Sequence, residues 1–458
     1  MDNTVVEQAP LRALVSWVLF DWAAQPFYTL ILTFLFAPYF ANVVARTPAE
    51  GQALWGYAAA VAGILVAISS PLLGAYADGR GKRKPWIAAL AALFVASLAS
   101  LWIATPGADA LVVGMVLAAF VAAIVAAELT SVFTNAIMPS LVPPSLLGRL
   151  SGAGWAVGYA GGLVSLAIMA GLVVANPATG KTLFGLEPML ALDGASREGD
   201  RLVGPFAAVW YVVFMVPFFL FVPDIARARP AAAPRPVLAE LAETIRSLPG
   251  NRDILLFLIA RMLYSDGLSA IFAFGGIYGA AVFGWGAIEL GMFGIVLTVT
   301  GVIGALIGGI LDDRLGAKTV IVAVLVWLLV GALGILSVDK SHVLFTVEVA
   351  PKPRGSGPFS SVGEQVFLAF AILVGVVSAP VQAASRSLLA RLAPPEKMAQ
   401  YFGLFAFSGK VTAFMAPLLV AAVTSATGDQ RLGMSSIAVF LILGFVLMLS
   451  VRGRTSAA

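Results

Sequence analysis

The sequence contains no cysteine and a single histidine among its 458 residues. The absence of cysteine excludes a disulfide framework, and one histidine leaves too few ligands for a metal centre of the zinc type. Charged side chains are also scarce, at 11% of all residues, where soluble domains carry roughly 25%. So few charges cannot cover the surface of a soluble protein of this length.

Long apolar runs take the place of the missing charge. Hydrophobic residues make up 60% of the chain, and the mean hydropathy is +0.96. A helix needs about 20 mostly apolar residues to cross a bilayer core. Twelve such runs occur, at residues 13–41, 53–77, 86–104, 110–138, 151–175, 206–222, 253–282, 288–311, 318–338, 364–390, 400–424 and 432–451. The sequence therefore predicts an all-α membrane protein with twelve transmembrane helices.

The positions of Lys and Arg predict the orientation of these helices. With twelve spans both termini lie on one side, and the segments on that side hold about twice as many Lys and Arg as the opposite segments. Positive residues favour the cytoplasmic side. We therefore expect both termini in the cytoplasm, in a plasma membrane or a bacterial inner membrane.

A polar segment divides the chain in the middle. It begins with 227-RARPAAAPRP-236, and an amphipathic helix follows, with an apolar face made of Leu238, Leu241, Ile245 and Leu248. A helix of this kind is typical of a surface helix on the inner leaflet. The predicted domains are an N-terminal six-helix bundle at 1–222, a cytoplasmic linker at 223–252 and a C-terminal six-helix bundle at 253–458.

Two motifs recur in the same order in both halves. The first is 74-GAYADGRGKRK-84, which matches 309-GILDDRLGAK-318 with an offset of 235 residues. The second is 143-PPSLLGRLSGAGWAVGYAG-161, which matches 394-PPEKMAQYFGLFAFSGKVT-412 with an offset of 251 residues. Two matches in order predict a duplicated six-helix unit, which is typical of secondary transporters.

The first motif resembles the signature loop of the major facilitator superfamily. The resemblance implies the major facilitator fold, with two pseudo-symmetric six-helix bundles. It also implies that the Asp contacts a helix N-terminus in the other half, where the dipole is positive, and that the first Gly permits close helix packing. A generic positively charged loop is the alternative. The gating residues expected from the two copies are Gly74, Asp78, Gly81, Arg83, Gly309, Asp313, Arg314 and Gly316.

Longer blocks narrow the resemblance. The segments 16-SWVLFDWAAQPFYTLILTFLFAPYF-40, 150-LSGAGWAVGYAGG-162, 261-RMLYSDG-267, 382-QAASRSLLARLAPP-395 and 402-FGLFAFSGK-410 are similar to the vacuolar amino-acid effluxer-like family (autophagy-related, "unknown major facilitator"). The resemblance implies export of neutral amino acids. One departure is Ala24-Gln25, where Asn is expected after Asp-Trp-Ala.

A competing resemblance points to sugar–cation symporters of the glycoside–cation type. It rests on 71-PLLGAYADGRGKRKPW-86, with acids on helices 1 and 4 and a Lys on helix 11. Those symporters carry Asp just before the Pro, where this chain has Ser70. The missing carboxylate weakens the case for a sodium site there.

Charged residues inside the spans are the main candidates for a transport site, because a charge at bilayer depth is costly and usually faces a cavity or a partner. They are Asp21, Glu128, Arg261, Asp266, Arg386 and Lys410. In the major facilitator fold, helices 1, 4, 7 and 10 line the cavity, and all but Lys410 fall on them. Fixed structural ion pairs are the alternative for the acids, and snorkelling is the alternative for Arg386.

Amide and aromatic side chains near these charges complete the expected site. They are Gln25, Tyr28, Trp155, Tyr159, Tyr264 and Gln382. Trp155 and Tyr159 are four residues apart and share one helix face. Aromatic side chains in a membrane bundle also serve as packing or interface anchors, which is the alternative for these residues.

The leading hypothesis is a secondary active transporter that moves a small polar organic solute, an amino acid or similar, by alternating access with proton coupling. A sugar–cation symporter is the alternative, and a channel or a non-transporting sensor is an alternative of another class. No nucleophile–base pair, metal cluster or phosphate-binding loop indicates an enzyme. We expect a monomer with no cofactor and no nucleic-acid partner, whose partners are its solute, a coupling proton and the lipid bilayer.

Overall fold

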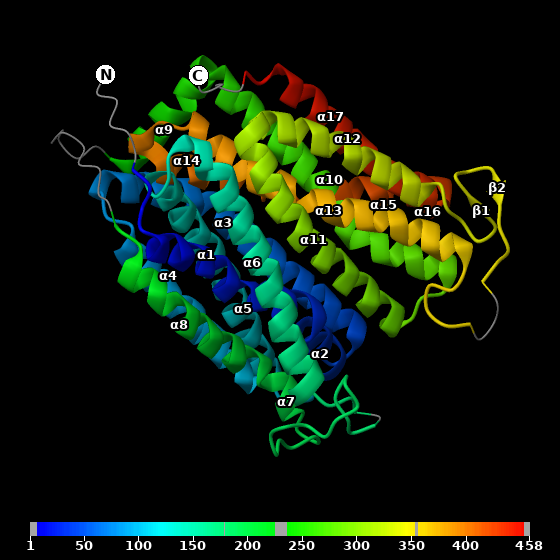
Figure 1. Ribbon diagram of the computed structural model, residues 1–458. Helices are drawn as coiled ribbons and strands as arrows, with labels where there is room; N and C mark the ends of the chain where they lie inside the picture. Colours follow the sequence, from blue (N-terminus) through cyan, green and yellow to red (C-terminus); the bar gives the residue numbers. More distant parts are fainter. Residues whose placement is uncertain (1–6, 178, 225–235, 353–355, 453–458) are drawn as a thin grey trace. The chain divides into compact units, whose positions relative to one another are not determined.

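The computed structural model describes residues 7–177, 179–224, 236–352 and 356–452, without the side chains of Arg80, Ala287 and Ile288. This part of the chain is almost entirely helical, as predicted (Figure 1). It contains 11 helices that are long and apolar enough to cross a membrane. These helices correspond to the predicted spans, with the exception of the span predicted at 400–424.

The chain divides into two compact units, each of which includes a short segment from the other half of the sequence. Unit 1 comprises Met1–Pro143, Val157–Leu238 and Pro395–Ala406, and unit 2 comprises Pro144–Ala156, Ala239–Pro394 and Phe407–Ala458. The predicted domains at 1–222, 223–252 and 253–458 place those short segments differently, and that division stays a prediction.

Unit 1 is built from the first half of the chain. Its helices are α1 (Leu11–Pro26), α2 (Phe36–Tyr39), α3 (Pro48–Arg80), α4 (Lys84–Ser100), α5 (Ala110–Ile137), α7 (Glu198–Arg201) and α8 (Val203–Phe221), with the later part of α6 (Leu147–Ile168) and most of α14 (Met398–Ser408). Helix α5 packs against α3 and α4, and α8 packs against α1 and α4. Aromatic rings fill this core. The rings of Trp55 and Phe120, for example, are stacked with their centroids 3.7 Å apart.

Unit 2 is built from the second half. Its helices are α10 (Arg252–Phe283), α11 (Ala287–Leu315), α12 (Ala317–Leu336), α13 (Val362–Leu392), α15 (Met415–Thr427), α16 (Gln430–Ser435) and α17 (Ile437–Ser450), with most of α9 (Val237–Ser247) and the start of α6. Helix α13 packs against α11 and α12, and α10 packs against α17. Between α12 and α13 lies a small antiparallel hairpin of β1 (His342–Val343) and β2 (Val347–Glu348).

The span predicted at 400–424 is broken. Helix α14 ends at Ser408, residues 409–414 form turns, and α15 begins at Met415. Pro417 accounts for part of the break, because it has no N–H for the Ala413 carbonyl and disfavours helical geometry at the residue before it. Lys410 therefore lies in the broken segment and not inside a continuous helix, and the eleventh predicted span is replaced by two shorter helices.

The first span carries wider π-helical turns. Residues Phe27–Phe34 and Phe40–Val44 are wound as π-helix, and together with α1 and α2 they form one span, Leu11–Val44. In the first of these segments the Leu35 N–H bonds to the Leu30 carbonyl at 2.9 Å. Residues Met169–Val173 at the end of α6 are wound in the same way. Such segments occur often at functional sites.

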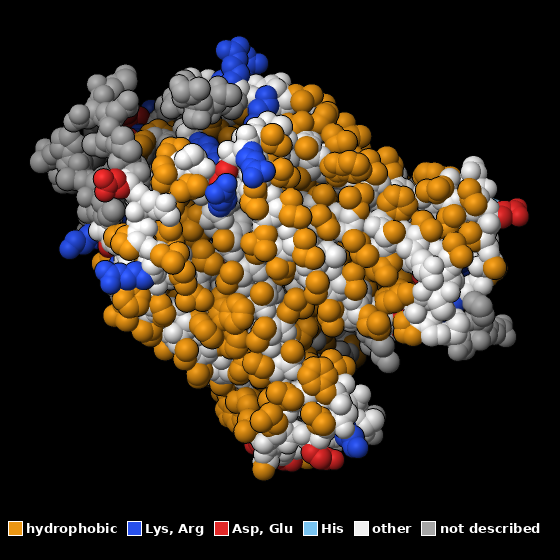
Figure 2. Space-filling view, viewed as in Figure 1, with side chains coloured by type: hydrophobic (Ala, Val, Ile, Leu, Met, Phe, Trp, Pro, Cys, Tyr) orange, Lys and Arg blue, Asp and Glu red, His pale blue; other side chains and the backbone are white. Residues whose placement is uncertain are grey.

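The surface agrees with a membrane location. Figure 2 shows hydrophobic side chains over most of the visible helical faces, with Lys and Arg gathered mainly toward one end of the helices. Many large apolar side chains on the spans are exposed, such as Ile64 and Ile68 on α3 and Val213 and Leu220 on α8. A helix that is apolar all round is either buried or in contact with lipid.

The amphipathic helix of the predicted linker is present as α9, and most of the stretch before it, residues 225–235, lies outside the described residues. Leu238 and Ile245 of its apolar face are exposed, whereas Leu248 is buried. An exposed apolar side on a short helix is compatible with contact to a membrane surface. That location stays a prediction.

Candidate functional site

The carboxylate of Asp78 lies at the end of α3, within unit 1, against the start of α14. It accepts hydrogen bonds from the N–H groups of Ala399 and Gln400, at 3.2 and 2.8 Å, and pairs with Arg83 at 3.1 Å. The first turn of a helix has N–H groups without partners and a positive dipole end, so a carboxylate is favourable there. We call Asp78, Arg83, Ala399 and Gln400 the first clamp.

Two glycines allow this contact. A Cβ on Gly74 would lie 2.9 Å from the Gln400 Cα and even closer to the backbone of Ala399. These are backbone atoms, so neither helix could yield without moving as a whole. Gly81 ends α3 with φ of +78°, a left-handed conformation that glycine adopts without strain. Gly74 therefore lies where α3 and α14 pack most closely, and Gly81 lies at the turn that follows α3.

Arg83 and its neighbour Lys84 are held by further contacts in unit 1. Arg83 donates to the Ala136 carbonyl at 3.0 Å, and Lys84 donates to the Phe219 carbonyl at 2.8 Å. Asp224 caps the start of α4 by accepting from the N–H groups of Arg83 and Lys84, at 3.0 and 3.1 Å. Sequence reasoning missed Asp224, although an acid directly after a span and opposite a basic loop is a usable signal.

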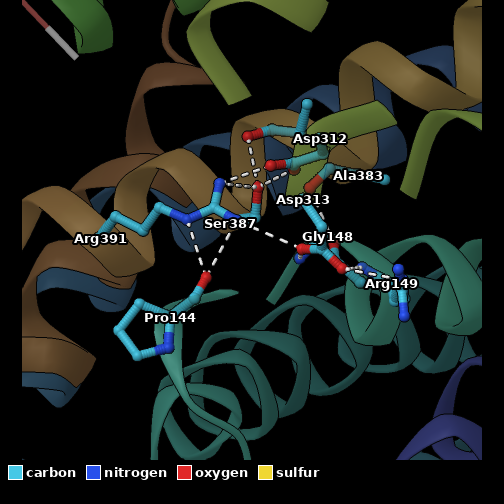
Figure 3. A network of polar contacts seen from close by, with 10 residues as sticks. Pro144, Gly148, Arg149, Asp312, Asp313, Ala383, Ser387 and Arg391 are labelled. Carbon is cyan, nitrogen blue, oxygen red and sulfur yellow. Dashed lines mark hydrogen bonds and ion pairs between the residues drawn. The ribbon is translucent and has the colours of Figure 1, made fainter. Parts of the chain in front are cut away.

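Unit 2 contains a second clamp of the same design. Asp313, near the end of α11, accepts from the N–H groups of Gly148 and Arg149 at the start of α6, at 2.7 and 3.1 Å (Figure 3). Its oxygens also lie 3.4 Å from the Arg149 side chain and 3.5 Å from that of Arg391. We call Asp313, Gly148, Arg149 and Arg391 the second clamp.

A second acid reinforces this clamp. Asp312 is almost fully buried, pairs with Arg391 at 2.5 Å and accepts a hydrogen bond from Ser387 on α13. Arg391 also donates to the Pro144 carbonyl at 3.3 and 3.2 Å, which ties α13 to the segment before α6 (Figure 3). Sequence analysis missed Asp312, Ser387 and Arg391, although two adjacent acids at the end of an apolar run were an available signal.

The other gating residues predicted from the second motif copy are Gly309, Gly316 and Arg314. A Cβ on Gly309 would lie 2.7 Å from the Gly148 carbonyl oxygen, so Gly309 permits close approach as Gly74 does. Gly316 separates α11 from α12 with φ of +86°. Arg314 is exposed, and the bases that reach the clamp carboxylates are Arg149 and Arg391 instead. The sequence spacing was misleading here because the base comes from another helix.

The two predicted acids of unit 1 lie near one aromatic side chain. Tyr28 is within electrostatic range of both Glu128 on α5 and Asp21 on α1. A Cβ on Gly158 would lie 3.2 Å from the Asp21 Cβ, so α6 passes directly beside Asp21. Gln25 packs against Gly162 in the same way, where a Cβ would lie 2.9 Å from its side chain. The structure therefore brings the predicted polar side chains of α1 together with α5 and α6. Tyr159 lies on the unit 1 part of α6, one residue after Gly158.

In unit 2 the broken segment lies beside Arg261 of α10. The Arg261 guanidinium donates to the Ser408 hydroxyl at 2.9 Å, at the carboxyl end of α14. A Cβ on Gly409 would lie 2.9 Å from that guanidinium. A cation at the carboxyl end of a helix complements the dipole. Gly409 and Gly158 are matching positions of the repeat, and they contact opposite charges, a guanidinium and a carboxylate.

Asp266 is the most buried of the predicted acids, at 1% exposure. Arg261 is the cation within electrostatic range of its carboxyl. Its Oδ2 atom has no hydrogen-bond partner among the described residues, and neither has the Thr412 hydroxyl. Tyr264, two residues before Asp266 on α10, shares a hydrogen bond of 2.7 Å with the buried Ser385 of α13.

Arg386 does not snorkel to the surface. Its side chain is buried, and it donates to the hydroxyl and carbonyl oxygens of Ser151 at 2.8 and 2.6 Å. The guanidinium thus joins α13 to the first part of α6 within unit 2. Gln382 lies one turn before it on α13, and Trp155 lies one turn after Ser151 on α6. Both are partly exposed.

The described part of the chain contains no group of three or more His, Cys, Asp or Glu side chains placed to hold a metal ion. The candidate site therefore consists of the mid-span charges and the two clamps. Arranged in this way, they can bind a polar solute or a proton and hold helix ends together.

Comparison with known proteins identifies relatives over nearly the whole chain. A family model described as "Vacuole effluxer Atg22 like" matches residues 50–457. The MFS-type transporter YxiO of Bacillus subtilis, itself called uncharacterized, is 26% identical over 451 residues, which are 96% of this chain and 95% of that protein. Autophagy-related protein 22-1 of Aspergillus fumigatus is 26% identical over 330 residues, covering 68% of this chain but only 49% of the fungal protein.

Solved structures show the same fold at low sequence identity. The transporter FucP in its outward conformation matches with a TM-score of 0.70 and 15% identity, covering 96% of this chain and 98% of that one. The human organic anion transporter MFSD10 matches with a TM-score of 0.69 and 15% identity, covering 95% and 99%. These likenesses confirm the predicted major facilitator fold of a membrane protein. The chain therefore belongs to the vacuole effluxer Atg22-like family, and it is a transporter of the major facilitator superfamily, not an enzyme.

Proposed function

We propose that this transporter is a secondary active carrier that moves a small polar organic solute, an amino acid or similar, by alternating access coupled to a proton. The observation that carries the proposal is the duplicated clamp. Ala399 and Gln400 follow Gly148 and Arg149 by the 251 residues of the second repeat, and Asp313 follows Asp78 by the 235 residues of the first. The same carboxylate-to-helix contact is built twice from matching positions.

The strength of a clamp suits a reversible switch. Hydrogen bonds to a charged group contribute about 1.5–3 kcal/mol each. Each clamp carboxylate accepts two backbone hydrogen bonds, so one clamp stabilises its state by a few kcal/mol. A solute that binds the other state more tightly by a similar amount can reverse the equilibrium. A clamp of this size therefore holds one state without making it permanent.

The side chains that we propose as solute contacts are polar groups found in each of the two units. They are Asp21, Gln25, Tyr28, Glu128, Trp155, Tyr159, Arg261, Tyr264, Gln382, Arg386 and Lys410. Mixed acidic and basic groups suit a solute that carries both charges. Asp266 is the acid that we assign to proton coupling, because it is the most deeply buried and its Oδ2 has no hydrogen-bond partner among the described residues.

Orientation and location are part of the same proposal. The excess of Lys and Arg beside the termini favours cytoplasmic termini and a plasma or bacterial inner membrane. Single cysteines at Gly194 and Glu348, both exposed between spans, would then react with an impermeant thiol reagent added outside. A cysteine at the exposed Lys82 would react only from inside. The native chain lacks cysteine, which makes the labelling unambiguous.

The experiment that tests the proposal is counterflow and proton flux in proteoliposomes. Purified protein is screened with labelled amino acids and labelled sugars, while a dye inside the vesicles reports pH. We expect counterflow of an amino acid together with solute-driven pH change, which Asp266→Asn abolishes while counterflow remains. Counterflow of a sugar alone would support the sugar–cation alternative. Flux without counterflow would support a channel, and solute transport without any proton movement would refute the coupling.

A further inference from the structure

The loop between α6 and α7 has an unusual distribution of side chains. Within 182-TLFGLEPMLA-191 the polar Thr182 is buried, whereas the large apolar side chains are exposed by 48–70%. Those exposed side chains are Leu183, Phe184, Leu186, Met189 and Leu190. Glu187 is the one charged residue of the segment. Figure 2 shows hydrophobic side chains at the surface of this region. A loop bathed in water favours the opposite arrangement.

The segment that exposes these apolar side chains has a defined, hydrogen-bonded backbone structure. Thr182 and Leu186 bond to each other through the Thr182 N–H and the Leu186 carbonyl at 2.9 Å, and the Gly185 N–H bonds to the Thr182 carbonyl at 2.9 Å. Gly185 has φ of +74°, which the turn requires. The loop therefore has a defined turn that presents its apolar side chains outward.

Backbone hydrogen bonds fix the loop beside the end of the preceding span. The N–H groups of Leu183 and Met189 donate to the carbonyls of Ala170 and Leu172, at 2.9 and 2.8 Å. These two acceptors lie in the π-helical turns Met169–Val173, where wider winding changes the pairing of carbonyl groups. A Cβ on Gly171 would meet the ring of Phe184, so that ring lies directly on the helix. Figure 1 shows the loop at this end of α6.

The length of the helix places these carbonyls at a membrane boundary. Arg149, near the other end of α6, has a side chain exposed by 54%, and an exposed cation is favourable only outside the hydrocarbon. Ala170 follows Arg149 by 21 residues, which is about 32 Å of helix. The hydrocarbon core is about 30 Å thick. The backbone of Leu183 and Met189 therefore lies close to the opposite edge of the hydrocarbon.

We propose that the segment 182–190 is a membrane-surface anchor whose partner is the lipid bilayer. Its exposed apolar side chains insert at the boundary between headgroups and acyl chains, as an amphipathic surface helix does. The apolar surface of the loop continues that of the span to which it is bonded. The anchor holds this end of α6 at a fixed depth and adds lipid contact beyond that of the span itself.

The test uses single cysteines labelled with a polarity-sensitive fluorophore in the full chain, reconstituted in lipid vesicles. Leu183→Cys and Met189→Cys report the anchor. Gly194→Cys is the matched control, because it lies in the same loop and a Cβ there meets nothing within 4 Å. We expect lipid-borne shallow nitroxides to quench the fluorophore at 183 and 189 but not at 194. Aqueous iodide should quench the two anchor positions about threefold less than the control.

Two further results decide between lipid and protein as the partner. Adding Leu183→Asp and Met189→Asp to a Leu186→Cys reporter should restore access to iodide, while Gly194→Asp should not. Equal iodide quenching at 183, 189 and 194 would refute the anchor. Shielding from iodide without quenching by the lipid nitroxides would also refute it, because the loop would then be covered by protein.

Discussion

The two clamps share their backbone chemistry and differ in their side-chain partners. In each, a carboxylate at the end of a span accepts hydrogen bonds from two successive N–H groups at the start of a helix from the other half of the chain. Asp78 takes its base, Arg83, from the loop directly after it. Asp313 takes its bases, Arg149 and Arg391, from two other helices. The repeat therefore specifies the carboxylate and its acceptor geometry but not the source of the neutralising charge.

Part of the difference comes from two substitutions between the repeats. The position that matches Asp312 in the first repeat is Ala77, and the position that matches Arg391 is Ser140. Unit 2 thus has an additional acid and an additional base, which bind each other at 2.5 Å and share Ser387. Unit 1 relies on one acid. The second clamp is consequently a network that can lose one member, whereas the first clamp is a single contact.

The largest effect is expected from neutralising the first clamp. Asp78→Asn removes the charge that holds two N–H groups and leaves the largely buried Arg83 with the Ala136 carbonyl alone. Asp313→Asn leaves Arg391 paired with Asp312 and with the Pro144 carbonyl. We expect Asp78→Asn to slow transport about tenfold, which corresponds to about 1.4 kcal/mol, and Asp313→Asn to slow it less.

Both variants should change the transport rate more than solute binding, because a clamp acts on the equilibrium between states. The measurements are initial counterflow rate and solute affinity for the two variants. Asp224→Ala serves as a control, since it removes a helix cap near the first clamp without touching Asp78. Equal slowing by Asp78→Asn and Asp313→Asn would contradict the distinction between a single contact and a network.

An effect on stability, equal in the two repeats, is expected from the glycines that match between them. A Cβ on Gly152 would lie 2.5 Å from the Ala305 carbonyl oxygen, and a Cβ on Gly403 would meet the matching Ser70 carbonyl, with 2.7 Å to the Pro71 Cα. Backbone atoms cannot move aside, so Gly152→Ala and Gly403→Ala should each destabilise their packing by about 1–3 kcal/mol.

Thermal unfolding and transport rate measure this symmetry. Gly63→Ala on α3 is the control, because its Cβ would meet nothing within 4 Å and alanine favours helix. We expect both packing variants to unfold at a lower temperature than the wild type, and the control to unfold at an unchanged temperature. A loss confined to one of the two would show that the repeats are not equivalent at their close contacts.

The sequence predicted the parts of this molecule that depend on local pattern. Apolar length located the spans, and the paired motifs located both clamp carboxylates and the glycines beside them. The source of the second base was missed because Arg391 is 78 residues from Asp313 along the chain. No spacing rule connects a carboxylate to a base that only the packing of α11 on α13 brings near.

The break at 409–414 shows a limit of predicting transmembrane helices from hydropathy. The run 400–424 is apolar enough for one helix, yet it contains Pro417 and a Gly409 that lies against the Arg261 guanidinium. The matching part of α6, with Gly158 beside Asp21, is continuous. Hydropathy measures transfer to lipid and is insensitive to a missing N–H. Pro417 was the visible signal of a break, and it predicts the structure of residues 400–424 better than their mean hydropathy does.

The smallest expected effect is the coupling between the two acids of the second clamp. Asp312 and Asp313 are adjacent, and both interact with Arg391, at 2.5 and 3.5 Å. If Asp312 supports the clamp by keeping Arg391 in place, then Asp313→Asn should slow transport more in an Asp312→Asn background than in the wild type. Residues that share a charged network show interaction energies of about 0.5–3 kcal/mol, and we expect about 1 kcal/mol here, or roughly fivefold in rate.

The measurement is a double-mutant cycle on counterflow rate, with Ser387→Ala as a milder variant that removes a hydrogen bond to Asp312 and keeps both charges. Because the network lacks an equivalent in the first repeat, Ala77→Asp combined with Asp78→Asn should produce no such coupling. Additive effects of Asp312→Asn and Asp313→Asn would mean that the two acids act separately, and the second clamp would then be as much a single contact as the first.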